Sequence, residues 1–335
     1  MPDPTQPSIT PDFLQHDRPP VPDMVVPRGV TPFHLAQQPV RGRLVRLGPL
    51  AQAIVTRHAL PRPVARLLAE ALALTAGLAA ALKYRGSFSM QAKGSGPVPM
   101  LVVDCTDAGA LRGYVRVDSQ KLSLYGANPS AGALLGKGYL AFTCDQGPDM
   151  ERYQGIVGIT GRTLAEMTQE YFRTSEQLKA EVHLAAEETP AGWRASALIL
   201  EKVAGEGGIA PEARGDLASP EARGETPAET IEADEEAWRT ALVLAATLKP
   251  EEMLDDALPP EELLHRLYHA EGLTVGRSRA LAYGCRCSRA KLAGVLQGFG
   301  AEDLDHMAEA GQITMNCEFC NIAFRFDRAE IGAAE

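Results

Sequence analysis

Cys285-Arg-Cys287 and Cys317-Glu-Phe-Cys320 decide how the last fifth of this chain folds. The two cysteine pairs are separated by 29 residues. Each short pair supplies two sulfurs from one bend, and the long loop between them lets the two bends face each other around a tetrahedral zinc ion. The second pair has a spacing typical of zinc knuckles, whereas a single residue between the first two cysteines is unusual. The complete pattern is therefore far more specific than either half, and it predicts a zinc site at all four sulfurs.

The residues around these cysteines predict a small module with few large apolar side chains. Ser288 is suited to cap a helix, a second helix is expected over about 302–310, and alternating residues on both sides of Cys317 and Cys320 predict a hairpin with the second pair at its turn. Such a module is marginal alone, while zinc bound to four thiolates supplies about 10–16 kcal/mol of apparent binding energy. We expect the module to fold with the metal and to lose its structure without it.

Four sulfur ligands argue against a hydrolytic zinc site and are compatible with either a redox-sensitive or a structural zinc site. A hydrolytic zinc needs an open coordination position, which a four-cysteine site does not provide. Oxidation of the sulfurs would remove the ligands and release the metal, and a disulfide across one residue closes a strained, readily reduced ring. Arg286 and Arg289 add positive charge that favours thiolates beside the first pair. Spacing alone leaves a redox switch and a purely structural zinc knuckle both open.

Composition limits the partners of this module. The chain has 335 residues, of which 45% are hydrophobic and 6% aromatic, and it carries a net charge of -10. This length predicts more than one domain. Nucleic-acid binding requires cations, yet the segment from Gly276 to Glu335 has seven Lys and Arg against eight Asp and Glu. We therefore expect no nucleic-acid partner.

The N-terminal residues and one apolar stretch bear on the compartment. Residues 1–32 are rich in proline, with neither a cationic start nor an apolar run, which predicts a disordered tail and no export signal. A reducing cytosol follows from this interpretation, and in that compartment paired cysteines are usually metal ligands or redox centres. The stretch from Val64 to Leu82 contains Arg66 and Glu70 and is read as a buried core helix, so no membrane partner is expected.

Residues 33–203 predict an α+β core domain of mixed helices and strands. The expected strands are residues 40–47, 88–92, 100–105, 111–117, 138–143 and 153–160, with a hairpin of 181–185 and 193–203. Helices are expected from Pro63 to about Lys83 and from about Thr163 to Gln177. The irregular mixture argues against a doubly wound sheet.

Residues 204–273 predict a linker that is first acidic and then helical. Between Ala204 and Glu236 ten acidic residues oppose two arginines, and frequent glycine and proline exclude regular structure in the first part. In the second part Trp238, Leu242, Ala245 and Leu248 form one apolar stripe, and residues 261–270 predict a second short helix. Residues 274–330 complete the chain as the four-cysteine module.

Other candidate sites are weaker. His265 and His269 are four residues apart on a helix, but Arg266 stands where a zinc-protease motif needs glutamate, so ordinary histidines are the simpler interpretation. The stretch Gly132-x3-Gly136-Lys137 is one residue short of a phosphate loop and lacks the following Ser or Thr. Gly94 and Gly96 are most simply read as a turn. Cys105 and Cys144 lie in expected strands and are interpreted as buried, inert thiols.

Taken together, the motifs resemble the redox-regulated holdase chaperones known as the 33-kDa chaperonin or 33-kilodalton heat-shock protein. The resemblance covers about residues 33–327, while Gly205–Glu229 and the proline-rich tail are additional to it. It rests on the stretches Val40-Arg-Gly-Arg-Leu-Val, Leu111-Arg-Gly-Tyr-Val-Arg, Gly136-Lys-Gly-Tyr, Glu151-Arg-Tyr-Gln-Gly-Ile-Val-Gly158, Tyr171-Phe-Arg-Thr-Ser-Glu-Gln-Leu178, Arg266-Leu-Tyr-His269, Cys285-Arg-Cys-Ser-Arg289 and Cys317-Glu-Phe-Cys320.

The resemblance implies a function for the zinc site. Cys285, Cys287, Cys317 and Cys320 would bind one zinc ion when reduced, and oxidants would convert them to Cys285–Cys287 and Cys317–Cys320 disulfides and release the metal. The module and linker would then unfold, the protein would tend to form a homodimer, and newly exposed surface would hold unfolding client proteins without ATP. A chaperone, not an enzyme, is expected. The alternatives are a thiol-disulfide oxidoreductase using Cys317 and Cys320, and a passive zinc-ribbon binding module.

Overall fold

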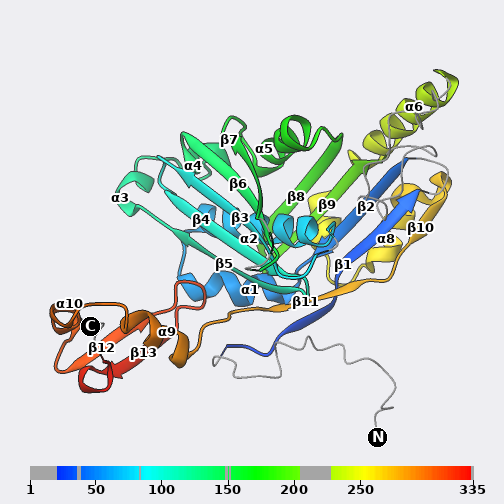
Figure 1. Cartoon of the computed structure of the whole chain (residues 1–335). Helices are drawn as coiled ribbons and strands as arrows, with labels where there is room; N and C mark the ends of the chain where they lie inside the picture. Colours follow the sequence, from blue (N-terminus) through cyan, green and yellow to red (C-terminus); the bar gives the residue numbers. More distant parts are fainter. Residues whose placement is uncertain are drawn as a thin grey trace, which may run out of the picture.

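The computed structural model describes residues 21–35, 39–82, 84–147, 150, 152–203 and 228–332. The proline-rich tail up to residue 20, the motif residue Glu151 and the acidic part of the linker up to residue 227 lie outside the described residues. The expected α+β class is confirmed: a large mixed sheet packs with helices, and a small cysteine-containing module follows at the C-terminal end (Figure 1).

One sheet of eleven strands organises the molecule. Its hydrogen-bonded order is β7-β6-β3-β4-β5-β11-β1-β2-β9-β8, with β10 pairing beside β1. The strands are β1 (Val25–Leu35), β2 (Val40–Arg46), β3 (Ser87–Gly94), β4 (Met100–Thr106), β5 (Ala110–Arg116), β6 (Gly138–Asp145), β7 (Tyr153–Gly158), β8 (Ala180–Thr189), β9 (Gly192–Lys202), β10 (Leu273–Val275) and β11 (Arg279–Tyr283). The strands expected between residues 40 and 203 are confirmed. In β3 and β4 buried side chains alternate with partly exposed ones, as expected for a half-buried strand, whereas β2 and β9 are buried almost throughout.

Two segments belong to this sheet although the sequence placed them elsewhere. Residues 25–32 were expected in the disordered tail, and they form most of β1. Proline is tolerated there because Pro27 lies at an irregularity in the β1–β11 pairing, between Val26 and Val30, where ladder hydrogen bonds are interrupted. Strand β11 was assigned to the cysteine module, and it pairs with β1 and β5 inside the main sheet.

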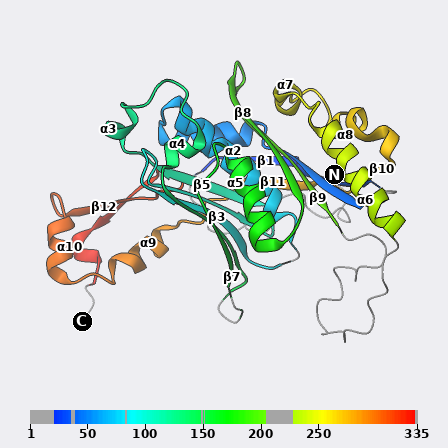
Figure 2. The same cartoon turned by 90° about the horizontal axis from the view of Figure 1, so that it is seen from above.

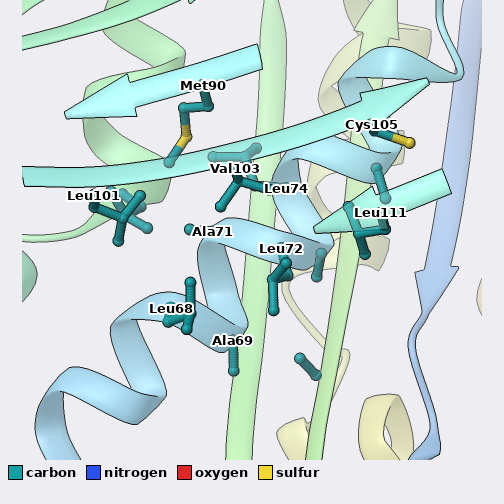
Figure 3. Packing of buried hydrophobic residues seen from close by; sticks show 14 of the residues in the cluster. Leu68, Ala69, Ala71, Leu72, Leu74, Met90, Leu101, Val103, Cys105 and Leu111 are labelled. Atoms are coloured by element: carbon teal, nitrogen blue, oxygen red, sulfur yellow. The ribbon is translucent and has the colours of Figure 1, made fainter. Parts of the chain in front are cut away.

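The main core lies between one face of the sheet and helix α2 (Arg62–Ala79). Figure 3 shows Leu68, Leu72 and Leu74 of this helix near Leu101 and Val103 of β4. Apolar residues surround α2 almost completely, as expected for a buried core helix, and it ends at Ala79. No helix within the described residues has the length and hydropathy needed to cross a membrane.

The remaining helices of this domain are α1 (Pro49–Val55), the 3-10 turn Thr56–His58, α3 (Ser119–Leu122), α4 (Ala131–Leu135) and α5 (Leu164–Tyr171). Helix α5 begins at a capping box made by Thr163 and Glu166 and continues as a π-helical turn over Phe172–Glu176. The helix expected near residues 163–177 is thus present, with a change of helix type in its second half.

Three linker helices cover the opposite face of the sheet. They are α6 (Ala228–Ala245), α7 (Pro250–Leu254) and α8 (Pro260–Tyr268), followed by a 3-10 turn over His269–Glu271. In β9, Ile199 belongs to the main core, whereas Leu198 and Leu200 contact the linker helices. The expected apolar stripe is confirmed, since Trp238 is buried against this face.

The cysteine module has its own small structure. It contains α9 (Arg289–Leu296), α10 (Ala301–Met307) and a hairpin of β12 (Gln312–Asn316) and β13 (Ala323–Asp327), followed by a 3-10 turn over Arg328–Glu330. The side chain of Ser288 accepts a hydrogen bond from the backbone N–H of Lys291, which confirms the expected cap. Among the described residues its separate core has five buried members, namely Leu296, Leu304, Ile313, Phe326 and Ile331. Figures 1 and 2 place this module and the linker helices at opposite ends of the main sheet.

Candidate metal and redox centre

The structure brings the four predicted cysteine sulfurs together. Cys285 and Cys287 follow directly after β11, and Cys317 and Cys320 occupy the turn between β12 and β13. The Sγ atom of Cys285 lies 3.5 Å from that of Cys287 and 3.6 Å from that of Cys317, and the Sγ atoms of Cys287 and Cys320 are also 3.6 Å apart. All four ligand atoms lie within 4.8 Å of one another.

This geometry fits a tetrahedral metal. Metal–sulfur bonds of about 2.3 Å place the sulfurs of a tetrahedron about 3.8 Å apart. Thiolates are ligands that zinc prefers, and the burial of all four sulfurs leaves little access for a water ligand. The group is close enough to hold a metal ion, and the identity of that ion as zinc stays a prediction.

Local backbone structure holds the sulfurs in place. The N–H of Cys317 donates to the carbonyl of Ile322, and the N–H of Asn321 donates to the carbonyl of Cys317 over 2.7 Å. Asn321 adopts a left-handed conformation with φ of 54°, which asparagine tolerates better than most residues. On the other side, a Cβ atom at Gly284 would lie 2.5 Å from the carbonyl carbon of Ala110, so only glycine lets the chain pass this close to β5.

The four thiols cannot all ionise without a cation. Burial raises the pKa of Cys287 to about 12, while hydrogen bonds from the neighbouring thiols of Cys285 and Cys320 lower the pKa of Cys317. One thiolate is therefore stabilised by the protons of its neighbours. A divalent cation replaces those protons and allows four sulfurs of like charge to lie side by side.

The second cysteine pair docks on the main sheet through Phe319. This ring lies edge-on to the ring of Tyr114 at a centroid distance of 5.0 Å, and the guanidinium of Arg112 lies 3.9 Å from its centroid. Glu318 pairs with Arg116 over 3.0 Å, and the side chain of Asn321 donates to the carbonyl of Arg57. The turn that carries two sulfurs is thus attached to β5.

The first cysteine pair is attached to β4 through Arg286. Its guanidinium lies 3.5 Å from the carboxylate of Asp104, which also pairs with Arg112 over 2.6 Å. Burial lowers the pKa of Arg286, and that it favours a thiolate beside the first pair stays a prediction. Arg289 points elsewhere, because its guanidinium lies over the ring of Phe326 and pairs with Glu330.

The weaker candidates form no comparable site. The rings of His265 and His269 stack at 5.3 Å, and among the described residues only the four cysteines gather as a metal-binding group. The turn of Gly94 and Gly96 packs against the segment between Gly132 and Gly136. Cβ atoms at Gly94 and Gly96 would lie 1.9 and 2.3 Å from the carbonyl oxygens of Leu135 and Leu134. Their role is to allow this close approach of two backbones.

The two remaining cysteines are buried, as expected. Cys105 and Cys144 lie opposite Phe88 from β4 and β6. Burial raises the pKa of Cys105 to about 12, so its thiol stays protonated at neutral pH.

The sequence did not identify Arg46, which anchors the linker. Its buried guanidinium donates to the backbone carbonyls of Glu252, Asp255 and Leu258, at and beyond the C-terminal end of α7. Arg194 of β9 pairs with Asp256 over 2.6 Å. The sequence offered no distinguishing signal, because Arg46 is one of three arginines in β2 and its partners lie more than 200 residues away.

Comparison with known proteins gives a consistent result. A family model described as "Hsp33 protein" matches residues 29–327. A protein of Caulobacter vibrioides (strain NA1000 / CB15N) named "33 kDa chaperonin" is 37% identical over 306 residues, covering 89% of this chain and 94% of the relative. A protein of the same name from Ectopseudomonas mendocina (strain ymp) is 35% identical over 294 residues, covering 87% and 90%.

A solved structure has the same fold. The crystal structure of the 33 kDa chaperonin (heat shock protein 33 homolog) from Thermotoga maritima superimposes with a TM-score of 0.70. It is 19% identical in sequence, and the match covers 91% of this chain and 96% of that chain.

Proposed function

The chain belongs to the Hsp33 family of chaperones, and from that membership we propose that it is a redox-regulated holdase. In this proposal the reduced, zinc-bound protein is inactive, and oxidation during stress makes it bind unfolding proteins without ATP. The observation that carries the proposal is the gathering of four buried cysteine sulfurs within 4.8 Å at the junction of the main sheet and a module with a very small core.

The chemical step is oxidation of the metal ligands. Two thiols give two electrons and two protons to one peroxide molecule, which becomes two waters, and a disulfide forms. The proposed bonds are Cys285–Cys287 and Cys317–Cys320. Two cross-pair distances, Cys285–Cys317 and Cys287–Cys320, are nearly as short as the distance within the first pair, but closing a short loop costs less entropy than closing a loop of about thirty residues. Zinc bound at this site would supply structural cohesion, and loss of its ligands removes that cohesion.

The proposed client surface is the sheet face that the linker covers. Phe33, Leu35, Val40, Leu44, Leu198 and Leu200 are almost fully buried beneath the linker helices. The ring of Phe33 stacks with that of Tyr268 at 5.5 Å. If the linker leaves, this face becomes a continuous apolar surface of the kind that marks a protein-binding site.

Few strong polar contacts hold the linker on this face. Glu235 of α6 pairs with Lys179 over 2.8 Å and with Lys202 over 2.7 Å, in addition to the contacts of Arg46 and Arg194. Exposed ion pairs contribute little and weaken with salt, so the linker is held mainly by its apolar stripe and by Arg46. An element held in this way is suited to open when its neighbour melts.

The other parts of the proposal follow the predicted domains, with β1 and β11 counted in the main sheet. Residues 25–203 together with β11 would form the client-binding and dimerisation domain, residues 204–273 the switchable linker, and residues 285–331 the zinc redox module. The oxidised protein would form a homodimer in the cytoplasm. It would have no catalytic role, in keeping with the name chaperonin that the relatives carry.

The test combines zinc release with client aggregation in one sample. The reduced, zinc-loaded protein is treated with peroxide at moderate heat while a chromogenic chelator follows the metal and light scattering follows an unfolding client such as citrate synthase. We expect about one zinc per chain to leave as aggregation is suppressed. Reduction with added zinc should reverse both signals.

The same preparation separates the two alternatives. A thiol-disulfide oxidoreductase would reduce insulin disulfides catalytically, which we do not expect here because the cysteines lack a thioredoxin-like βαβ setting. A passive zinc module would release zinc without any gain in client binding. That second outcome would refute the switch.

A further inference from the structure

Strand β11 occupies an unusual place in the sheet. Strands β7-β6-β3-β4-β5 form one half and β1-β2-β9-β8 form the other, and β11 is the strand that joins them. It runs antiparallel to β1 and parallel to β5. Among the described strands, no other contact in the sheet connects the two halves.

The backbone pairing of β11 is short. It has five residues and shares only two register positions with β5, at Ala282 and Tyr283. Its pairing with β1 is interrupted between Val26 and Val30. The first cysteine of the metal centre, Cys285, follows after Gly284, so the centre fixes the C-terminal end of this strand. Loss of the centre therefore removes the anchor from the strand that joins the half-sheets.

The two halves do not depend on β11 to stay folded. Helix α2 packs against β2, β8 and β9 of one half and β3, β4 and β5 of the other. Strand β5 is paired along most of its length with β4, from Met100–Arg116 to Cys105–Leu111. Without β11, one edge of β5 is unpaired, while α2 still packs on its face and β4 still pairs with its other edge. The distance from β5 to β1 is then two strand spacings, about 9.6 Å.

The vacated position has defined chemistry. The carbonyl of Gly109 accepts from the N–H of Ala282 over 2.9 Å, and that of Leu111 accepts from Gly284 over 2.8 Å. Leu281 and Tyr283 are 2% and 1% exposed and belong to the main core. Leu281 fits because residue 29 is glycine, where a Cβ atom would lie 2.6 Å from its Cγ atom.

We propose that the position of β11 is a second client site, which accepts an extended segment of an unfolding protein by strand addition to β5. This inference rests on the proposed function, because it requires oxidation to release β11. The occupant is an extended segment with two large apolar residues separated by one small residue, as in Leu281-Ala282-Tyr283, since Ala282 is completely buried. Unpaired strand edges bind such segments through main-chain hydrogen bonds and select them by side-chain pockets. This mode differs from adhesion to the apolar face beneath the linker.

A labelled copy of the strand tests the proposal. A fluorescent peptide with the sequence of residues 278–284, Ser-Arg-Ala-Leu-Ala-Tyr-Gly, carries a photoreactive group and is titrated against the full-length protein in its reduced zinc-bound and oxidised forms. We expect the oxidised protein to bind at least about tenfold more tightly, because β11 fills the site at rest. A peptide with Ala282→Pro lacks the N–H that meets Gly109 and should lose about tenfold in affinity, and a scrambled peptide is the composition control.

The position of the cross-link and the client assay decide between outcomes. Cross-links to residues 100–116 of β4 and β5 support the site, whereas cross-links to β8 and β9 overturn it. Equal binding to the reduced and oxidised proteins also overturns it. If the oxidised protein suppresses client aggregation and does not bind the peptide, the inference fails and the chaperone function stands. If the peptide binds as expected and client aggregation is unaffected, the site stands and the proposed function fails.

Discussion

At the scale of single residues, Phe319 connects the cysteine centre to the main domain. Phe319 precedes Cys320 in the sequence, and its ring contacts both Tyr114 and Arg112 of β5. Arg112 in turn pairs with Asp104, which faces Arg286 between the sulfurs of the first pair. Both cysteine pairs are therefore tied to one small charged and aromatic cluster on β4 and β5.

Phe319→Ala should weaken this attachment without removing a ligand. The aromatic and cation–π contacts together contribute about 1–3 kcal/mol, so the docked module opens more often. We expect peroxide-triggered zinc release to become several-fold faster at unchanged zinc stoichiometry, measured with a chromogenic chelator. Phe299→Ala is the matched control, because Phe299 is exposed in the same module. Equal acceleration by both substitutions would contradict the docking role.

Glu70 of α2 should make the main domain less stable as the pH rises. Burial raises the pKa of Glu70 to about 7, with Arg66 one turn away opposing the shift. The folded state thus holds a proton that the unfolded state releases above its ordinary pKa of 4.5, and this stabilisation is lost as the pH rises through about 7. Denaturant unfolding should show Glu70→Gln to be more stable than the parent by about 3 kcal/mol at pH 8.5 and nearly equal to it at pH 4. Glu170→Gln, on an exposed pair with Arg173, should show no such crossover.

The sequence predicted the four cysteines as a group because their spacing alone brings two sulfurs to each bend. It could not predict Arg112, Tyr114 or Asp104 as their neighbours. These residues lie about 170–215 positions earlier in the chain, and only the pairing of β11 with β5 brings them to the metal centre.

At the scale of elements, Arg46 and helix α7 determine how firmly the linker is held. A buried guanidinium that donates to three carbonyls uses most of its hydrogen-bonding capacity on the backbone of the linker. The carbonyls near the end of a helix lack intrahelical partners and carry partial negative charge, so a cation is well placed there.

Arg46→Met should release the linker more easily. Loss of the charged hydrogen bonds leaves three carbonyls without partners and should cost about 3 kcal/mol. We expect faster amide exchange in residues 250–268 and client binding at lower temperature or without full oxidation. Arg239→Met is the control, since Arg239 is exposed and pairs with Glu236 of its own helix. Unchanged exchange in the Arg46 variant would refute the anchoring role.

Elements were predictable where one face is buried and the local pattern is strong. Strand β3 alternates buried and intermediate side chains, and β8 and β9 were recognised as a hairpin. Strand β1 was missed because its two prolines suggested a disordered tail, although proline is compatible with the bulge and with the paired position opposite Arg43. The short strand β11 has too few residues to show a period of its own.

At the scale of the whole molecule, two cores of very different size share one chain. The main core extends behind the whole sheet, whereas the described part of the module has five buried core residues of its own. The metal centre lies between them, and its sulfurs belong to the edge of the main core. Stability is therefore distributed unevenly between the two ends of the chain.

Chelation of zinc under reducing conditions should unfold the module and spare the main domain. We expect amide protection to be lost over residues 285–331 and retained in α2, β2 and β9, because the large core does not require the metal. Hydrogen exchange with mass spectrometry measures both regions in one experiment, and re-addition of zinc is the control. Uniform loss of protection across the chain would show that the domains unfold as one unit.

The strand order of the large sheet was beyond prediction from the sequence. The composition break at residue 204 suggested that everything after it lies outside the first domain. Strand β11 nevertheless begins 76 residues after Val203 and lies in the centre of the sheet of that domain. Nothing in five residues of alternating small and apolar side chains indicates such a return.

This central position affects biosynthesis. Residues 279–283 are made long after residues 25–30 and 110–111, which are their partners in the sheet. Both half-sheets therefore emerge from the ribosome with their inner edges unpaired, and contacts of such large sequence separation form slowly. A newly made chain should pass through a long-lived intermediate with a vacant central strand, so its own synthesis is a period in which it is prone to aggregation until the last strand arrives.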